Sequence, residues 1–190
     1  MNHLKSFVLF AFLLTASRCC FSQTVFPPLD MSPMDMSYYP AEYPIMKIQH
    51  KADIPLIARV IYGRPQKNDR SIFGDLVPFD MVWRAGANEA TEIEFFRDVK
   101  IDGKKILKGR YTLYAIPSTE KWTIILNKET DTWGAFGYDA KKDLLRTEVQ
   151  VITRPDIIEI FTIYFEGNDK TKTSLMIVWD NKEVHLPIKW

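Results

Sequence analysis

The residues best suited to binding chemistry lie within the sequence WRAGANE, at positions 83–89. Trp83 offers an aromatic wall and Arg84 a cation. Asn88 and Glu89 add an amide and a carboxylate. Ligand sites combine apolar walls with a few polar groups, so this stretch suits a small polar ligand such as a sugar. The same residues also suit a structural turn, in which Trp83 anchors the core and Arg84 forms an ion pair with Glu89.

The backbone of this stretch carries its own signals. Gly86 lies between two alanines, which indicates a position with positive φ or with a close neighbour. Asn88 tolerates the left-handed region and can form a hydrogen bond with its own backbone. We therefore expect a loop here that leads directly into the strand pattern TEIEFF.

Two further loops are expected to meet this stretch at one end of the domain. One lies just upstream and carries Arg64 and Lys67. The other, TWGAFGYD, carries Trp133 and Tyr138 with two glycines that allow close approach. Aromatic residues on such turns also serve as core plugs. The candidate ligand-binding residues are Arg64, Lys67, Trp83, Arg84, Asn88, Glu89, Trp133 and Tyr138.

The sequence offers little for catalysis, and no catalytic residue is predicted. After the N-terminal segment only His50 and His185 remain, far apart in the sequence, and no cysteine remains. A zinc site needs three or four converging ligands, so no metal or cofactor is expected. No serine lies in a nucleophile motif, and no glycine-rich phosphate loop is present.

Carboxylates leave one enzymatic alternative open. Asp80, Glu89 and Glu92 could support a hydrolase acting on envelope sugars or peptides if two of them shared a pocket. The pattern favours a non-enzymatic binding domain that takes a small polar ligand or an envelope protein. An envelope scaffold with a large exposed apolar patch is a third class.

The rest of the chain predicts the elements that must position these residues. Short strand patterns recur about every ten residues, and TEIEFF alternates apolar and polar positions. Asp102-Gly103 suits a two-residue hairpin, and residues 178–188 suggest a closing hairpin with Val184, Leu186 and Ile188 inward. The fold class is therefore all-β: a single-domain antiparallel β-sandwich or barrel-like fold with at most one short helix, within DAKKDLLR.

The N-terminus has the order of a secretory signal peptide, with Lys5, an apolar run and small residues before a cut near Ser22-Gln23. We expect a signal peptide at 1–22, a Pro-rich extended leader at 23–53 and the β-sandwich domain at 54–190. The location is then the periplasm or the extracellular space. A lipid anchor is disfavoured because Arg18 precedes the first cysteine.

Charge gives no reason to expect nucleic acid or an anionic membrane as partner. The formal net charge of the full chain is +1, and no run of like charges occurs. The apolar run of the signal is too short to span a bilayer, so no transmembrane segment is expected. The sequence leaves the oligomeric state open.

A family resemblance covers most of the domain, from about Ala58 to Val151. It rests on ARVIYGRPQK, IFGDLVPFDMVWRAGANEATEIEF, VKIDGKKILKGRYTLYAIP, WTIILNKETDTWGAFGYD and DLLR. With these segments the chain resembles the domain of unknown function 2911 family, found in exported bacterial proteins. The resemblance implies a small, mainly β domain behind a signal peptide. The family carries no established activity, so it implies no catalytic or binding residue.

Overall fold

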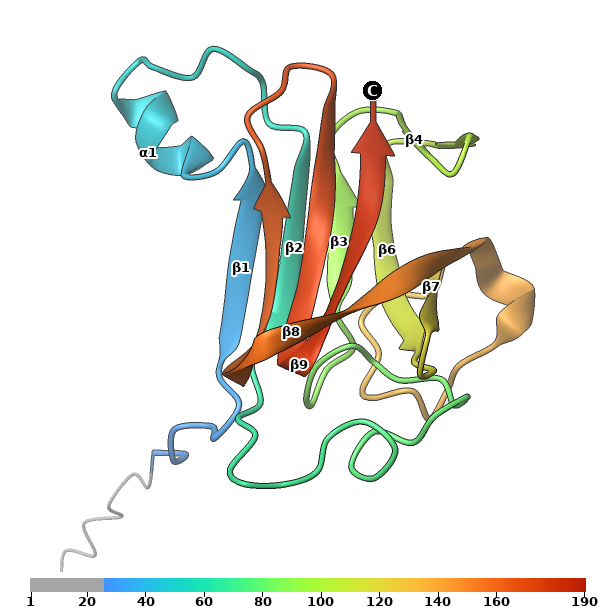
Figure 1. The fold of residues 1–190 in the computed structure, drawn as a ribbon. Coiled ribbons are helices and arrows are strands. Elements are labelled where there is room, and N and C mark those ends of the chain that lie inside the picture. Colours follow the sequence, from blue (N-terminus) through green and yellow to red (C-terminus); the bar gives the residue numbers. More distant parts are fainter. Residues whose placement is uncertain (1–25) are drawn as a thin grey trace, which may run out of the picture.

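The computed structural model describes residues 26–190, and the predicted signal peptide lies outside the described residues. The predicted all-β class is confirmed: antiparallel strands form one sheet in the order β1-β2-β3-β6-β7-β8-β9-β4-β5 (Figure 1). Within the described residues no helix is long and apolar enough to cross a membrane. The elements are β1 (Met34–Tyr39), α1 (Tyr43–Ile48), β2 (Ala58–Gly63), β3 (Glu92–Phe95), β4 (Val99–Ile101), β5 (Lys104–Ile106), β6 (Gly109–Ile116), β7 (Lys121–Asn127), the 3₁₀ turn η1 (Ala140–Lys142), β8 (Asp143–Glu166) and β9 (Lys172–Lys189).

The long strand β8 turns the sheet into two layers. Its first part, as far as Gln150, pairs with β7. From Val151 onward it pairs with β9 instead. Figure 1 shows β8 crossing the molecule diagonally between the two groups of strands. One layer therefore holds β1, β2, β3, β6 and β7, and the other holds β9, β4 and β5.

Strand periodicity sets which side chains fill the space between the layers. In β3, Ile93 and Phe95 are fully buried, as the alternation of TEIEFF predicts. In β9, the predicted inward positions Val184, Leu186 and Ile188 are also buried. Both layers therefore present one apolar face to a shared interior, as in a β-sandwich.

An aromatic cluster occupies the centre of this interior. Trp83 stacks on Trp179 with ring centroids 6.1 Å apart and an interplanar angle of 15°. Trp122 meets the Trp83 ring edge-on at 6.0 Å. Phe161 packs against both Trp83, at 5.2 Å, and Trp179, at 5.7 Å. Because each ring buries a large apolar area, this cluster holds the two layers together without any disulfide.

The segment expected to be an extended leader, residues 23–53, contains regular structure. β1 pairs with β2 along its whole length, and Tyr39 at its end is fully buried. A strand is compatible with the flanking Pro33 and Pro40 because β1 is the first strand of the sheet order and the prolines lie outside it. The pattern MDMSYY between these prolines is only six residues long, and the many prolines around it suggested an extended segment instead of a strand.

Two turns predicted from the sequence are confirmed. Asp102 and Gly103 form the predicted hairpin turn between β4 and β5, with φ values of 49° and 73°. The closing hairpin predicted within residues 178–188 lies inside β9: the Trp190 N–H donates to the Thr171 carbonyl at 3.0 Å, so the two ends of β9 lie side by side and the chain reverses between them (Figure 1). Asp180, with φ of 53°, lies at this reversal.

Glu183 in β9 is the centre of a small polar network on the second layer. It is buried and accepts hydrogen bonds from Arg154 and His185, while Arg154 also pairs with Asp156 at 3.0 Å. Burial alone would raise the pKa of the Glu183 carboxyl, but the His185 and Arg154 contacts outweigh it and lower this pKa below its ordinary value.

The lowered pKa predicts how this network contributes to stability. A depressed carboxyl pKa gives stability above the unfolded-state value of about 4.3, and that stability is lost as the pH falls through the folded-state value. We expect Glu183→Gln to lower the free energy of unfolding by about 2 kcal/mol at pH 7. The difference from wild type should shrink below about pH 4. Urea unfolding at both pH values measures it, with the exposed Glu166→Gln as control; an equal loss at both pH values would contradict the network's ionic character.

Candidate functional site

The WRAGANE stretch forms a loop that leaves the first layer and returns to it. Trp83 exchanges two backbone hydrogen bonds with Ala115 of β6, at 2.7 and 2.9 Å. Eight residues later the chain rejoins the same strand, where the Leu113 N–H donates to the Thr91 carbonyl at 2.8 Å. The Thr91 hydroxyl closes the base of the loop by donating to the Ala85 carbonyl at 2.6 Å. The loop is thus fixed at both ends by one strand.

Close backbone contact with the end of β2 determines the shape of the loop. A Cβ on Gly63 would lie 2.4 Å from the Ala87 carbonyl oxygen, and a Cβ on Gly86 would lie 3.0 Å from the Gly63 oxygen. Gly86 is therefore required by a close neighbour, one of the two reasons that the sequence suggests. Positive φ occurs at Ala85, at 52°, and at the predicted Asn88, at 60°.

Beside this loop lies a pocket of about 250 Å³ at the end of the sandwich. Its lining includes the buried Trp83 and Trp179, and Arg84 and Asn88 contribute polar groups. The remaining lining residues come from the loop after β2, from the 86–87 backbone and from the segment before β1: Ser32, Pro65, Arg70, Leu76, Val77, Gly86 and Ala87. Three stretches of the chain therefore meet around one concavity.

Arg84 is the unusual group of this pocket. Its Nε is buried and has no hydrogen-bond partner within the described part of the chain. Burial lowers the pKa of the Arg84 guanidinium, and no neighbouring carboxylate offsets that effect. The group still carries its charge at neutral pH, because an arginine pKa starts far above 7. A buried donor without an acceptor is costly, and such groups are rare in native structures.

The structural-turn interpretation holds for Trp83, which is buried in the core, but not for the ion pair between Arg84 and Glu89. Among residues 26–190 Arg84 forms no ion pair, so the expected Arg84–Glu89 pair is absent. Glu89 is exposed, its backbone forms a bridge with Trp133, and it lines a separate pocket of about 140 Å³. The turn is held by backbone contacts instead, which leaves the Arg84 side chain without a structural partner.

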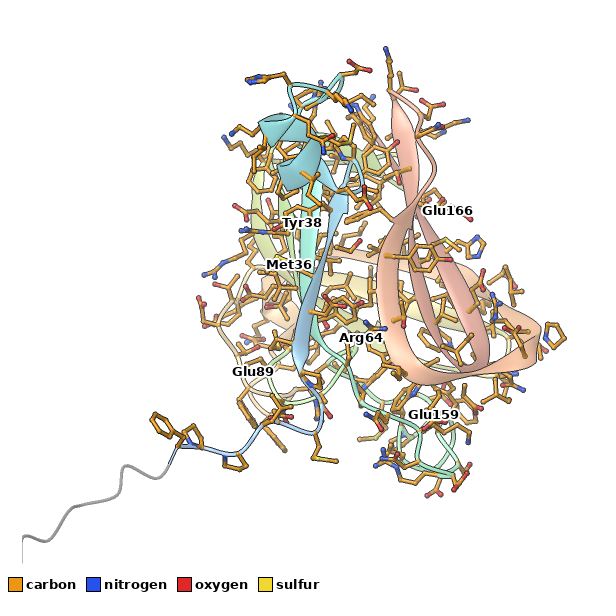
Figure 2. All side chains as sticks on the ribbon, turned by 90° about the vertical axis from the view of Figure 1, so that its left-hand side faces the viewer. Met36, Tyr38, Arg64, Glu89, Glu159 and Glu166 are labelled. Atoms are coloured by element: carbon orange, nitrogen blue, oxygen red, sulfur yellow. The ribbon has the colours of Figure 1, made fainter. Side chains whose placement is uncertain are left out.

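The predicted residues Arg64 and Lys67 connect the two layers. Arg64 donates to Asp35 of β1 at 2.9 Å, and to the Phe161 carbonyl and the Thr162 hydroxyl of β8 at 3.2 and 2.9 Å. Figure 2 shows it between these two strands. The Lys67 ammonium lies 3.7 Å from Asp180. Both cations are thus engaged by the protein and do not line the Arg84 pocket.

The third predicted loop approaches the WRAGANE loop, but its aromatic side chains point elsewhere. The Gly134 N–H donates to the Asn88 carbonyl at 2.9 Å. The Trp133 side chain is 60% exposed. Tyr138 donates to Asp143 at 2.6 Å and packs against Tyr114, which fixes the loop over the outer face of the first layer. The three loops approach one another through backbone contacts. Among the predicted side chains, only those of Trp83, Arg84 and Asn88 line the same pocket.

Some pocket residues were not predicted as site residues. Trp179 ends the continuous apolar run LMIVW, which predicts that it is buried, but nothing local connects it with a loop far upstream. Arg70 is held on the rim by the Lys67 carbonyl at 2.9 Å. Asp30 accepts a hydrogen bond from the Asn88 amide at 2.8 Å, so the segment before β1 lies beside the pocket. These contacts depend on tertiary structure that no local pattern encodes.

Two of the carboxylates named for the hydrolase alternative lie in one pocket. Glu89 and Glu92 line the same small pocket together with Asp131. Glu92 is already paired with Arg110 at 3.2 Å and accepts the Asp131 N–H at 2.7 Å. Within the described residues, no group of three or more histidine, cysteine or acidic side chains comes together to hold a metal ion.

Fold and site together define an antiparallel β-sandwich with a small, partly polar pocket at one end. Sequence comparison then gives the family: the family model described as "Protein of unknown function (DUF2911)" matches residues 44–188, and the chain belongs to this family. The resemblance stated from the sequence is confirmed, and the matched residues include α1 and every strand from β2 onward. The comparisons found no matching curated protein and no matching solved structure.

The close contact at Gly63 predicts a large effect of one methyl group. We expect Gly63→Ala to lower the free energy of unfolding by about 3 kcal/mol, because its Cβ would collide with the Ala87 carbonyl oxygen in a loop that β6 holds at both ends. Gly137→Ala is the matched control, since its Cβ would meet nothing within 4 Å. Chemical denaturation compares the two variants, and similar stabilities would contradict the close approach.

Proposed function

We propose that this protein is an exported domain that binds a small, oxygen-rich anionic ligand in the Arg84 pocket. The observation that carries the proposal is the buried Arg84 Nε, which has no acceptor in the described part of the chain. A carboxylate bound in the pocket would add a charge-assisted interaction with the Arg84 guanidinium. Such a bond contributes about 1.5–3 kcal/mol, enough to make Arg84 the principal anchor.

The rest of the pocket supports a sugar-like ligand with one acidic group. Trp83 and Trp179 form the buried floor of the pocket, which gives it an apolar side. Asn88 and Ser32 are placed to form hydrogen bonds with hydroxyl groups. At about 250 Å³ the pocket is smaller than the ~300–1,000 Å³ typical of drug-sized ligands. A single sugar acid, or the acidic end of a longer glycan, fits these features.

The hydrolase alternative has weaker support. It needs two carboxylates free to act as acid and base, and the pocket shared by Glu89 and Glu92 brings two together. Glu92 is engaged by Arg110 and by a backbone N–H, so its oxygens already have partners. A ligand in the Arg84 pocket, in contrast, would not have to displace an existing ion pair of Arg84 within the described residues.

Binding of a sugar acid gives a direct test of the Arg84 pocket. Glucuronate serves as the probe and glucose as its neutral counterpart, with isothermal titration calorimetry as the measurement. We expect wild-type protein to bind glucuronate more tightly than glucose, and Arg84→Ala to weaken glucuronate binding at least about tenfold. The melting temperature of Arg84→Ala should stay the same or rise, because the variant removes an unsatisfied buried donor.

The matched control is Arg97→Ala, which removes one exposed arginine between β3 and β4. It should leave glucuronate binding unchanged. If Arg84→Ala lowers the melting temperature by many degrees and leaves glucuronate binding intact, Arg84 has a structural role and the proposal fails.

Export is proposed from the signal-like segment at residues 1–22. When the full-length chain is expressed in a bacterium, the mature protein should begin at or near Gln23 and should lie outside the cytoplasm. Intact-mass analysis of fractionated cells measures both properties. A full-length chain that keeps Met1 and stays in the cytoplasm would contradict export.

A further inference from the structure

We propose a second binding site, for a multivalent phosphate-type anion, in a groove at the opposite end of the sandwich from the Arg84 pocket. In Figure 1 the β8–β9 turn, the end of β9 and strand β4 lie at the upper end, and the long loop after β2 lies at the lower end. The groove has a volume of about 670 Å³. It is lined by Asp98, Val99, Lys100, Lys105, Asp169, Thr171, Lys172, Lys189 and Trp190.

The lysines of this groove come from separate strands and gather at one place. Lys100 belongs to β4 and Lys105 to β5, while Lys172 and Lys189 lie at the two ends of β9. They are spaced too widely in the sequence to form a basic run. The nearly neutral chain therefore gains a local cationic surface only when it folds.

Two of these lysines face each other across a strand pair. Lys100 and Lys189 are direct partners in the register of β4 and β9, so their side chains leave the same face of the sheet. Like charges directly opposite each other destabilise an antiparallel pair. An anion bound between the two ammonium groups would turn this repulsion into attraction.

The acidic residues of the groove are already engaged; hydrogen bonds from Thr171, together with the nearby Lys172 charge, lower the pKa of the Asp169 carboxyl. Asp98 accepts the Lys108 N–H at 2.9 Å and pairs with Lys105 at 2.8 Å. Asp169 accepts the N–H and the hydroxyl of Thr171, both at 2.7 Å, within its own turn. In the described part of the chain, Lys105 is the only groove lysine with an ion pair. Lys100, Lys172 and Lys189 keep their charge for a ligand.

The wall of the groove is fixed by contacts with the first layer. The Trp190 N–H donates to the Thr171 carbonyl at 3.0 Å, and the Trp190 ring packs on Tyr39 with centroids 5.3 Å apart. The Tyr39 hydroxyl donates to the Asp169 carbonyl at 2.6 Å. The β8–β9 turn and Trp190 are thus held in place, so binding does not require the groove to be assembled.

The chemistry of the groove favours a phosphate-type anion over a single carboxylate. Lysine binds phosphate as a point charge, whereas planar bidentate recognition of a carboxylate is the property of arginine. No arginine lines this groove. Several ammonium groups around a wide, open volume suit a ligand with two or more negative charges.

Inorganic pyrophosphate is the probe for this site. We expect the protein to bind it saturably in low salt, with a signal in both calorimetry and tryptophan fluorescence. The fluorescence change should be lost in Trp190→Phe. Lys100→Ala/Lys189→Ala should weaken pyrophosphate binding at least about tenfold, and its melting temperature should stay the same or rise because the variant removes a like-charge pair.

The control variants separate this site from net charge and from the Arg84 pocket. Lys47→Ala/Lys51→Ala removes two exposed charges on and beside α1 and should leave pyrophosphate binding unchanged. Arg84→Ala should also leave it unchanged, so that the two sites succeed or fail independently. Absence of saturable binding in the millimolar range, or an equal loss in both lysine double variants, would overturn the proposal.

Discussion

The stack of Trp83 on Trp179 is the contact on which both the fold and the candidate site depend. Trp83 is attached to the first layer through its backbone bonds to Ala115, and Trp179 belongs to β9 in the second layer. Their parallel rings, with centroids 6.1 Å apart, therefore join the two layers at one end of the sandwich. The same two rings also line the Arg84 pocket. Because these rings serve both purposes, a shift of one layer against the other would change the pocket as well as the core.

This arrangement explains how a binding loop can be rigid in a domain without disulfides or metal ligands among its described residues. The WRAGANE loop is closed at its base by β6 and pressed against β2 at Gly63, so its polar side chains need not hold it in shape. Arg84 is consequently left half-buried beside the pocket with its Nε unsatisfied, a feature that it shares with Arg59 and that calls for an explanation. The lysine groove at the other end has a similar property, since Asp98 and Asp169 already have partners and three of its four lysines form no ion pair in the described part of the chain.

Local sequence patterns were sufficient for the strands and for the loop chemistry, and insufficient wherever distant segments decide the outcome. Alternation predicted the buried faces of β3 and β9, and Asp102-Gly103 predicted its hairpin, because both signals act over a few residues. The same reasoning predicted that Trp83, Arg84 and Asn88 belong to one loop. It missed β1, whose short alternation is surrounded by prolines. It also grouped Arg64 and Lys67 with the site, although each is paired across the layers, and it overlooked Trp179 because the stack joins residues far apart in the chain.

The state of the Arg84 Nε–H in the free protein tests the account most directly. In a nitrogen-labelled protein its resonance can be assigned by comparison with Arg84→Lys and followed by NMR during a titration with glucuronate. The account predicts a signal that shows no hydrogen-bond coupling to any protein acceptor in the free state, and that shifts in a saturable manner as glucuronate binds. A hydrogen bond from this group to a protein oxygen in the free state, with no shift on titration, would show that Arg84 is a structural residue and would contradict the binding role.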